Sequence, residues 1–341
     1  MGSGDRMIDR RKFAQAMALT WSARFGFGRA QTSSRTYRVG YLGYTEATAP
    51  DEVDGWPAFV QRLGELGFVE GHNLALLSRY AEGHDERYAD FAAEFARLGV
   101  DLVVVASGTA ARAVMTVSPA TPIVTVAVPD PVRAGLIASL ARPGGRVTGI
   151  SNLADDLTPK RIELLKAAVP SVRKMAFARC PGCALSAGES AAQVDARYAQ
   201  YAAAARALGM DLLPLNVNAA SDFLAARAIV HRERPDALLI GATQINVALR
   251  TEWLALAAEQ RLPVMAPYRG FGAMLSYGPD FVAIYRRAAE FVALILNGAN
   301  PAETPMEQPT KFELVVNLKL AHAAGLEIPQ ALLLRADAVI R

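Results

Sequence analysis

Two cysteines provide the most reactive side chains in this sequence. Cys180 and Cys183 enclose Pro181 and Gly182 in a C-x-x-C motif, directly after an apolar segment. In a reducing compartment this spacing indicates a redox or metal site, whereas in an oxidising compartment a local disulfide is the simpler state. Metal binding is disfavoured because it needs four ligands and no partner pair of Cys or His is evident. We therefore expect a structural disulfide, with thiol–disulfide exchange as the alternative.

Small polar residues follow several apolar segments and could bind a ligand. Ser107 ends DLVVVAS (101–107), and with Gly108, Thr109 and Ala110 it opens a helix, where unpaired backbone N–H groups and hydroxyls can bind a carboxylate. A plain helix cap is the alternative. Asp130 follows the next apolar segment and would face the same ligand, unless it serves only an Asx turn. The other candidate ligand-binding residues are Tyr44, Thr45, Ser151, Asn152, Gln244, Asn246 and Tyr268.

Catalytic motifs are absent from the sequence. The four histidines are dispersed, and no HExxH, GxSxG, Walker or strand-associated GxGxxG motif occurs. We therefore expect no catalytic residue, no cofactor and no metal. Polar residues that follow the apolar segments, without a nucleophile and a base among them, indicate a ligand-binding protein and not an enzyme.

Charge is concentrated at the N-terminus. The net charge at pH 7 is +3, but residues 1–30 carry six basic and two acidic side chains, so the rest of the chain is slightly acidic. The body of the sequence has no basic stripe interleaved with aromatic residues. We therefore expect no nucleic-acid partner.

The N-terminal segment is typical of an export signal. Arg10 and Arg11 precede an uncharged stretch, residues 13–23, that is too short for a bilayer core requiring about 20 residues. Small residues at Gly28 and Ala30 suit signal cleavage, and the arginine pair resembles a twin-arginine signal. An amphipathic or disordered tail is the alternative. We expect residues 1–30 to be removed near Ala30 and the mature protein to be a periplasmic monomer.

The candidate residues must be positioned by alternating strands and helices. From residue 38 onward, short β-branched apolar segments alternate with stretches of helical period, which predicts parallel β-α-β units. Strands are expected over 38–44, 73–81, 101–107, 122–128, 174–180, 210–217, 236–242 and 264–268. Helices are expected over 56–68, 87–99, 109–117, 158–170, 197–209, 222–235 and 251–263. The pattern restarts after 151–156, which predicts two doubly wound α/β lobes that bind ligand beyond the carboxyl ends of their strands.

Several long segments resemble the ABC transporter substrate-binding proteins of the tryptophan-type (TrpX-like) family. They are FVQRLGELGFVEGHNLAL (59–76), RYAEG (79–83), VASGTAA (105–111), PIVTVAVPDPVRAGLIASLARPGGRVTGISNL (122–153), KRIELLKAAVP (160–170), LSYGPD (275–280) and EQPTKFELVVNLKLAHAAGL (307–326). The resemblance runs from about Arg38 to the C-terminus.

The resemblance implies a type I periplasmic binding protein fold. Two Rossmann-like lobes, joined by three crossovers, would close on a small ligand between them. Lobe 1 would comprise residues 36–150 plus 278–305, and lobe 2 residues 153–275 plus 312–341. Family members deliver ligands, aromatic amino acids among them, to a membrane permease driven by a cytoplasmic ATPase.

The resemblance also indicates which residues bind ligand and where this chain differs. Residues 107–109 match the family's SGTPAA-like motif, which would bind the ligand's carboxylate or an equivalent polar head. In the family, small residues are common at the position of Arg133. The family also has an Asn-Pro-rich loop, which faces the cleft, where this chain has the motif from Cys180 to Cys183. Two other functions remain: a redox protein that uses C-x-x-C, and the ligand-sensing domain of a regulator. The regulator is disfavoured because an export signal, not a helix-turn-helix, precedes Arg38.

Overall fold

The computed structural model describes residues 35–44 and 50–341. The predicted export signal over residues 1–30 and the candidate residue Thr45 lie outside the described residues. The chain divides into two units, Met1–Arg35 and Thr36–Arg341, and the second contains the elements described below.

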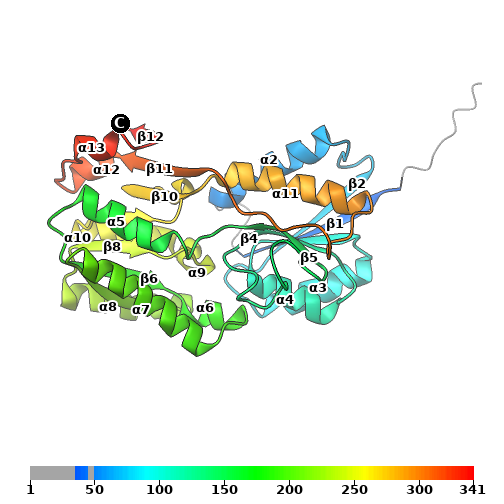
Figure 1. The fold of residues 1–341 in the computed structure, drawn as a ribbon, viewed down its shortest axis with the longest axis horizontal. Coiled ribbons are helices and arrows are strands. Elements are labelled where there is room, and N and C mark those ends of the chain that lie inside the picture. Colours follow the sequence, from blue (N-terminus) through cyan, green and yellow to red (C-terminus); the bar gives the residue numbers. More distant parts are fainter. Residues whose placement is uncertain (1–34, 45–49) are drawn as a thin grey trace, which may run out of the picture. The chain divides into compact units, whose positions relative to one another are not determined.

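Two sheets organise the second unit, and helices cover both faces of each (Figure 1). The first sheet has the order β2-β1-β3-β4-β5 and is parallel throughout. Its strands are β1 (Tyr37–Gly43), β2 (Leu74–Tyr80), β3 (Leu102–Val105), β4 (Ile123–Val128) and β5 (Val147–Ser151). All of β3 is buried, as expected for an apolar strand covered on both faces.

The second sheet has the order β12-β11-β10-β9-β8-β6-β7, and β10 pairs with β11 antiparallel. Its strands are β6 (Lys174–Arg179), β7 (Asp211–Asn216), β8 (Ala237–Ile240), β9 (Val264–Ala266), β10 (Leu275–Pro279), β11 (Phe312–Asn317) and β12 (Ala338–Ile340). The two parallel-rich sheets with helices on both faces match the predicted α/β class of two Rossmann-like lobes.

The helices of the first lobe come from both ends of the chain. They are α2 (Pro50–Glu65), α3 (Arg87–Leu98), α4 (Gly108–Val117) and α11 (Phe281–Leu296). In Figure 1, α11 lies alongside α2, and both contribute to one apolar core against the first sheet. Within that core the Tyr41 and Tyr285 hydroxyls are hydrogen-bonded at 2.9 Å. The opposite face is covered by α3 and α4, so the first lobe is completed by a late segment of the chain.

The second lobe has helices on both faces of its sheet and two separate apolar cores. These helices are α5 (Thr158–Ala168), α6 (Pro181–Ser186), α7 (Ala191–Ala207), α8 (Phe223–Glu233), α9 (Gln244–Ala248), α10 (Arg250–Gln260), α12 (Leu318–Ala323) and α13 (Gln330–Leu333). Helix α7 begins earlier than predicted because Ser190 and Gln193 form a capping box. Within the described residues, no helix combines the length and apolarity needed to span a membrane.

The chain passes between the sheets after β5, after β10 and before β11. The prediction that the first lobe resumes at residue 278 is wrong by a few residues. Strand β10 continues to Pro279 because Gly278 and Pro279 pair with β11 of the second sheet. Asp280 then caps α11 by accepting the Ala283 N–H at 3.0 Å, so the helix of the first lobe begins immediately after the crossing.

Candidate functional site

A cavity lies between the two lobes, at the carboxyl ends of strands from both sheets. The predicted residues that line it are Tyr44, Ser107, Gly108, Thr109, Asp130, Asn152, Gln244, Tyr268, Cys180 and Cys183. The first lobe contributes the segments that follow each of its strands, β1 to β5, and the second contributes those that follow β6, β8 and β9. Segments distant in the sequence therefore meet in one concave site.

Two candidates from the first lobe do not line the cavity. Ala110 is fully buried in the core, and its N–H donates to the Ser107 Oγ at 3.1 Å. Ser151 is also buried, and its hydroxyl donates to the Pro129 carbonyl at 2.8 Å. The structure thus places Ala110 and Ser151 outside the cavity lining: the Ala110 N–H takes part in the cap of α4, and the Ser151 hydroxyl bonds to the backbone.

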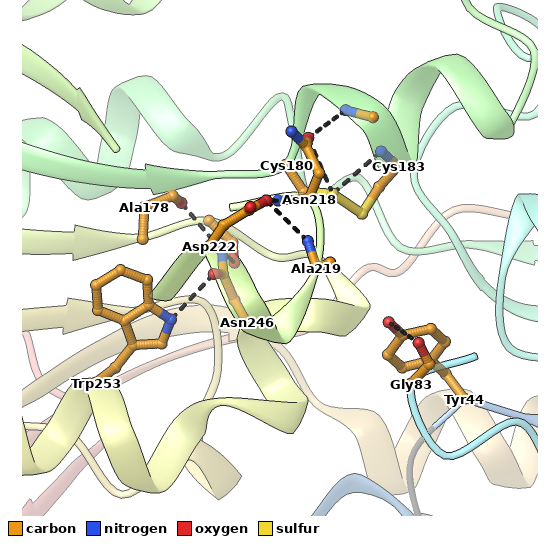
Figure 2. Close-up of a disulfide and its surroundings, with 12 residues drawn as sticks. Tyr44, Gly83, Ala178, Cys180, Cys183, Asn218, Ala219, Asp222, Asn246 and Trp253 are labelled. Carbon is orange, nitrogen blue, oxygen red and sulfur yellow. Dashed lines mark hydrogen bonds between the residues drawn. A yellow bond between two sulfur atoms is a disulfide. The ribbon is translucent and has the colours of Figure 1, made fainter. Parts of the chain in front are cut away.

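Asn246 is the third candidate placed elsewhere, although it follows β8 as predicted. Its amide donates to the Ala178 and Gly241 carbonyls, each at 3.1 Å, and its Oδ1 accepts the Trp253 indole N–H at 3.1 Å (Figure 2). Trp253 is fully buried, so its N–H needs an internal acceptor. Asn246 therefore lies outside the cavity lining, and its side chain bonds to buried polar groups in the core of the second lobe.

The N-terminus of α4 presents backbone donors to the cavity. Ser107 is the N-cap, and the bond from Ala110 satisfies one of the first amides. The N–H groups of Gly108 and Thr109 have no acceptor within the helix, because a first turn leaves such donors unpaired. Both residues line the cavity. Asp85, a half-buried residue that follows β2 and also lines the cavity, was missed by the sequence reasoning. Burial raises the pKa of its carboxyl group, and the nearby Thr109 side chain partly offsets that rise.

Aromatic rings from both lobes form part of the cavity wall. Tyr268 and Phe281 pack with ring centroids 4.6 Å apart. Tyr44 lies on the first lobe, as Phe281 does, and its hydroxyl donates to the Gly83 carbonyl at 3.3 Å (Figure 2). Burial, and then the nearby Asp85 carboxylate, raises the pKa of Tyr44 above its ordinary value, so the phenol stays neutral. Phe281 was missed because it opens α11 instead of following a predicted strand.

The disulfide forms another part of the wall. Cys180 and Cys183 are bonded across the first turn of α6, with their Cα atoms 5.3 Å apart (Figure 2). The Asn218 Oδ1 accepts the Gly182 N–H at 2.7 Å. In turn, the Asp222 carboxylate accepts the Asn218 N–H at 2.9 Å. These bonds anchor the disulfide turn to the segment after β7, which makes this wall a fixed surface.

Charged residues missed by the sequence reasoning also line the cavity. Arg197 bridges Asp155, at 3.3 Å, and Glu189. Arg161 is 1% exposed, and burial lowers its pKa to about 10. The sequence did contain a signal for Arg161. Its spacing from the apolar residues of α5 places it on the buried face of that helix.

Arg161 connects three segments near the lobe crossings. Its Nε donates to the Tyr277 carbonyl at 2.7 Å, its Nη1 to the Ala154 carbonyl at 2.7 Å and its Nη2 to the Pro267 carbonyl at 3.1 Å. Ala154 follows β5, Pro267 follows β9 and Tyr277 lies in β10. The guanidinium therefore fixes the backbone at two of the places where the chain passes between lobes.

Direct hydrogen bonds join the two lobes beside the cavity. The Gln244 Nε2 of the second lobe donates to the Ala106 carbonyl of the first at 2.8 Å. The Arg112 Nη2 of the first lobe donates to the Ala187 carbonyl of the second at 2.8 Å. A Cβ atom at Gly108 would lie 3.0 Å from the Ala187 Cβ, so glycine there lets α4 approach the second lobe closely.

Comparison with known proteins assigns the chain to a family. Residues 53–340 match the family described as ABC transporter substrate binding protein. The chain belongs to this family. Proteins of the family are extracytoplasmic and bind solutes, and they are not enzymes.

Relatives of this substrate-binding protein share its length and fold. A tyrosine-binding protein from Clostridioides difficile (strain R20291) is 26% identical over 265 residues, covering 76% of this chain and 73% of the relative. A conserved domain protein from Vibrio cholerae is 26% identical, with a TM-score of 0.81 and coverage of 89% and 100%. An ABC domain from Streptococcus pneumoniae in complex with L-Trp has the same coverage, a TM-score of 0.80 and 21% identity. The family resemblance and the type I periplasmic binding protein fold are thus confirmed.

The substrate-binding protein pairs its distinctive Arg133 with a neighbouring acid. The Arg133 guanidinium lies 2.9 Å from the Asp130 carboxylate, and the Arg133 N–H donates to the same side chain at 2.9 Å. Asp130 thus forms a local turn, as its alternative interpretation suggested, while also lining the cavity. Its charge is already compensated within the protein.

Proposed function

We propose that this substrate-binding protein is the solute-capturing component of an ABC importer. It captures a small carboxylate-bearing ligand by hinge closure and delivers it to a membrane permease. The protein acts as a periplasmic monomer, without nucleic acid, after a twin-arginine-type signal over residues 1–30 is removed near Ala30. N-terminal sequencing of the mature protein would locate the cleavage. The Cys180–Cys183 disulfide is structural, as suits an oxidising compartment.

One observation carries the proposed ligand class: free helix donors and aromatic rings line a single interlobe cavity. The Gly108 and Thr109 amides offer donors and a positive partial charge to a carboxylate. Tyr268 and Phe281 offer ring faces to an apolar side chain. An aromatic amino acid fits this combination. The named tyrosine-binding relative and the L-Trp complex support the choice.

Thr109→Ala removes the hydroxyl beside the two amides and is expected to weaken binding of L-tyrosine and L-tryptophan by roughly 2- to 12-fold, because an ordinary hydrogen bond contributes about 0.5–1.5 kcal/mol and both amides remain. Isothermal titration calorimetry with both amino acids measures this change. Thr116→Ala is the matched control: it lies on the same helix, is exposed and bonds to the Arg112 carbonyl at 2.9 Å. Wild-type affinity in the Thr109 variant would show that the carboxylate binds elsewhere.

Hinge closure rests on the few direct bonds between lobes. Gln244 and Arg112 each donate one hydrogen bond from one lobe to the other. Opening of the cavity therefore requires little more than the loss of these bonds and dihedral changes in the segments that cross between the lobes. Small-angle X-ray scattering is expected to give a smaller radius of gyration with saturating L-tryptophan than without it. Gln244→Ala is expected to shift the ligand-free protein further towards the larger radius. Identical curves with and without bound ligand would refute closure.

A further inference from the structure

Helix α6 lies along the wall of the cavity and begins at the disulfide. Cys180 and Cys183 line the cavity at its start, and Ala184 and Ala187 line it further along. Cys180 belongs to an apolar core of the second lobe, whereas all six residues of α6 are at least partly exposed. An α-helix this short is not stable in isolation. The position of α6 therefore depends on its ties to the rest of the lobe.

The disulfide is the covalent tie among them. It joins Cys183 of the partly exposed helix to Cys180, which is 5% exposed. The bond from the Gly182 N–H to the segment after β7 adds one hydrogen bond at the same end, and the Glu189 carboxylate pairs with α7 beyond the other end. Without the disulfide, one hydrogen bond would hold the start of α6, and the helix would be free to pivot about its far end.

The far end of α6 contacts the first lobe. The Ala187 carbonyl accepts the Arg112 Nη2 at 2.8 Å, and the Ala187 Cβ faces Gly108 at the start of α4. Gly188 follows with a φ of +102°, and an added Cβ there would overlap the Arg112 guanidinium. A fit this close between the lobes requires α6 to stay in one position.

From this arrangement we propose that the Cys180–Cys183 disulfide positions α6 for closure of the lobes, and that its reduction by a dithiol weakens ligand capture. The inference rests on the proposed closure and adds a redox dependence to it. In the oxidised protein the Ala187 carbonyl is held where the Arg112 guanidinium reaches it. In the reduced protein α6 must first be ordered, so closure costs more conformational entropy.

Reduction of the disulfide is a two-step thiol exchange. A thiolate of the dithiol attacks the sulfur of Cys183, the more exposed cysteine. The S–S bond breaks, a mixed disulfide forms and Cys180 leaves as a thiolate. The second thiolate of the dithiol then displaces Cys183. Overall, two electrons and two protons pass from the dithiol to the two cysteines, and the dithiol becomes a disulfide. By linkage, a ligand that prefers the oxidised protein makes the disulfide harder to reduce by the same factor.

Calorimetry with L-tryptophan, on oxidised protein and on protein reduced with dithiothreitol, tests the coupling. We expect reduction to weaken binding by about 2- to 12-fold, the effect of one interlobe hydrogen bond. The variant Cys180→Ser/Cys183→Ser should bind like the reduced protein and should not respond to dithiothreitol, because the sequence has two cysteines. Equal affinity of the oxidised and reduced wild-type protein, which needs no substitution, would overturn the inference.

Arg112→Met separates positioning from a general loss of stability. It keeps an unbranched apolar side chain but removes the donor to Ala187, so reduction should have no further effect on its affinity. Gln244→Ala is the matched control, because its bond to the Ala106 carbonyl joins the lobes without involving α6. Reduction should weaken binding by this control as much as by the wild type. An equal loss on reduction in Arg112→Met and in the wild type would refute the role of α6.

Two measurements without ligand separate this inference from the proposed ligand. On reduction, hydrogen–deuterium exchange should become about 10-fold faster for the amides of residues 187–189, which bond back to α6, and small-angle scattering should give a larger radius of gyration. Unchanged exchange at these amides would refute the inference whichever ligand binds. If neither L-tryptophan nor L-tyrosine binds the oxidised protein, the aromatic amino-acid class fails. The inference then stands only when both ligand-free changes occur, and it fails otherwise.

Discussion

Arg161→Lys is expected to lower the free energy of unfolding by about 2–6 kcal/mol. The arginine donates to three carbonyls from three segments while 1% exposed. A lysine ammonium is a compact point charge and cannot span three acceptors placed around a planar fork. At least two buried carbonyls would lose their donor, and each such loss costs about 1–3 kcal/mol. Denaturant unfolding followed by circular dichroism measures the change.

The control for this substitution is Arg232→Lys. The Arg232 side chain is 70% exposed and pairs with its sequence neighbour Glu233, so this variant should unfold like the wild type. Arg161→Lys should also show weaker ligand binding, because the segments it fixes lead into the crossings. An unfolding midpoint equal to that of the control would contradict the structural role assigned to Arg161.

Gly278→Ala is the second substitution with a large expected effect. Gly278 pairs with Glu313 in the sheet of the second lobe, and a Cβ atom there would overlap the Pro267 carbonyl oxygen. That oxygen belongs to backbone and accepts the Arg161 Nη2, so it cannot rotate away as a side chain would. We expect the free energy of unfolding to fall by about 3 kcal/mol, which is at the upper end of the usual cost of overpacking. Thermal and denaturant unfolding both report it.

Gly64→Ala provides the comparison for Gly278→Ala. Gly64 lies in α2 with no atom within 4 Å of an added Cβ, and alanine favours helix more than glycine does by about 1 kcal/mol. The Gly64 variant should therefore be as stable as the wild type or slightly more stable. Equal stability of the two alanine variants would show that the close approach at Gly278 can relax freely.

Sequence periodicity predicted eight of the twelve strands in the described residues, because buried parallel strands require continuous apolar runs, and it missed β5, β10, β11 and β12. Residues that follow those strands could thus be assigned to the cavity, as with Ser107 and Gln244. Periodicity could not predict which of them the core would use. Asn246 also follows β8, but its side-chain oxygen accepts a hydrogen bond from the indole N–H of Trp253 in the core.

Arginines on helices and acids on connecting segments were among the site residues that the sequence reasoning missed. Arg161 and Arg197 lie on α5 and α7, and both reach the cavity. Their direction depends on how these helices pack against the second sheet, which is a tertiary property. Asp155 and Glu189 come from connecting segments, where no period exists to indicate an inward face.

The late arrival of α11 has a consequence for synthesis of the protein. The first core contains residues from β1 together with Tyr285, Phe291 and Leu296 of α11. A ribosome must therefore translate both sheets as far as β10, and then α11, before the N-terminal lobe can bury that face. The second sheet is also incomplete until β11 and β12 have been made. Neither lobe can reach its final fold until segments of both have been translated, so the two lobes mature together.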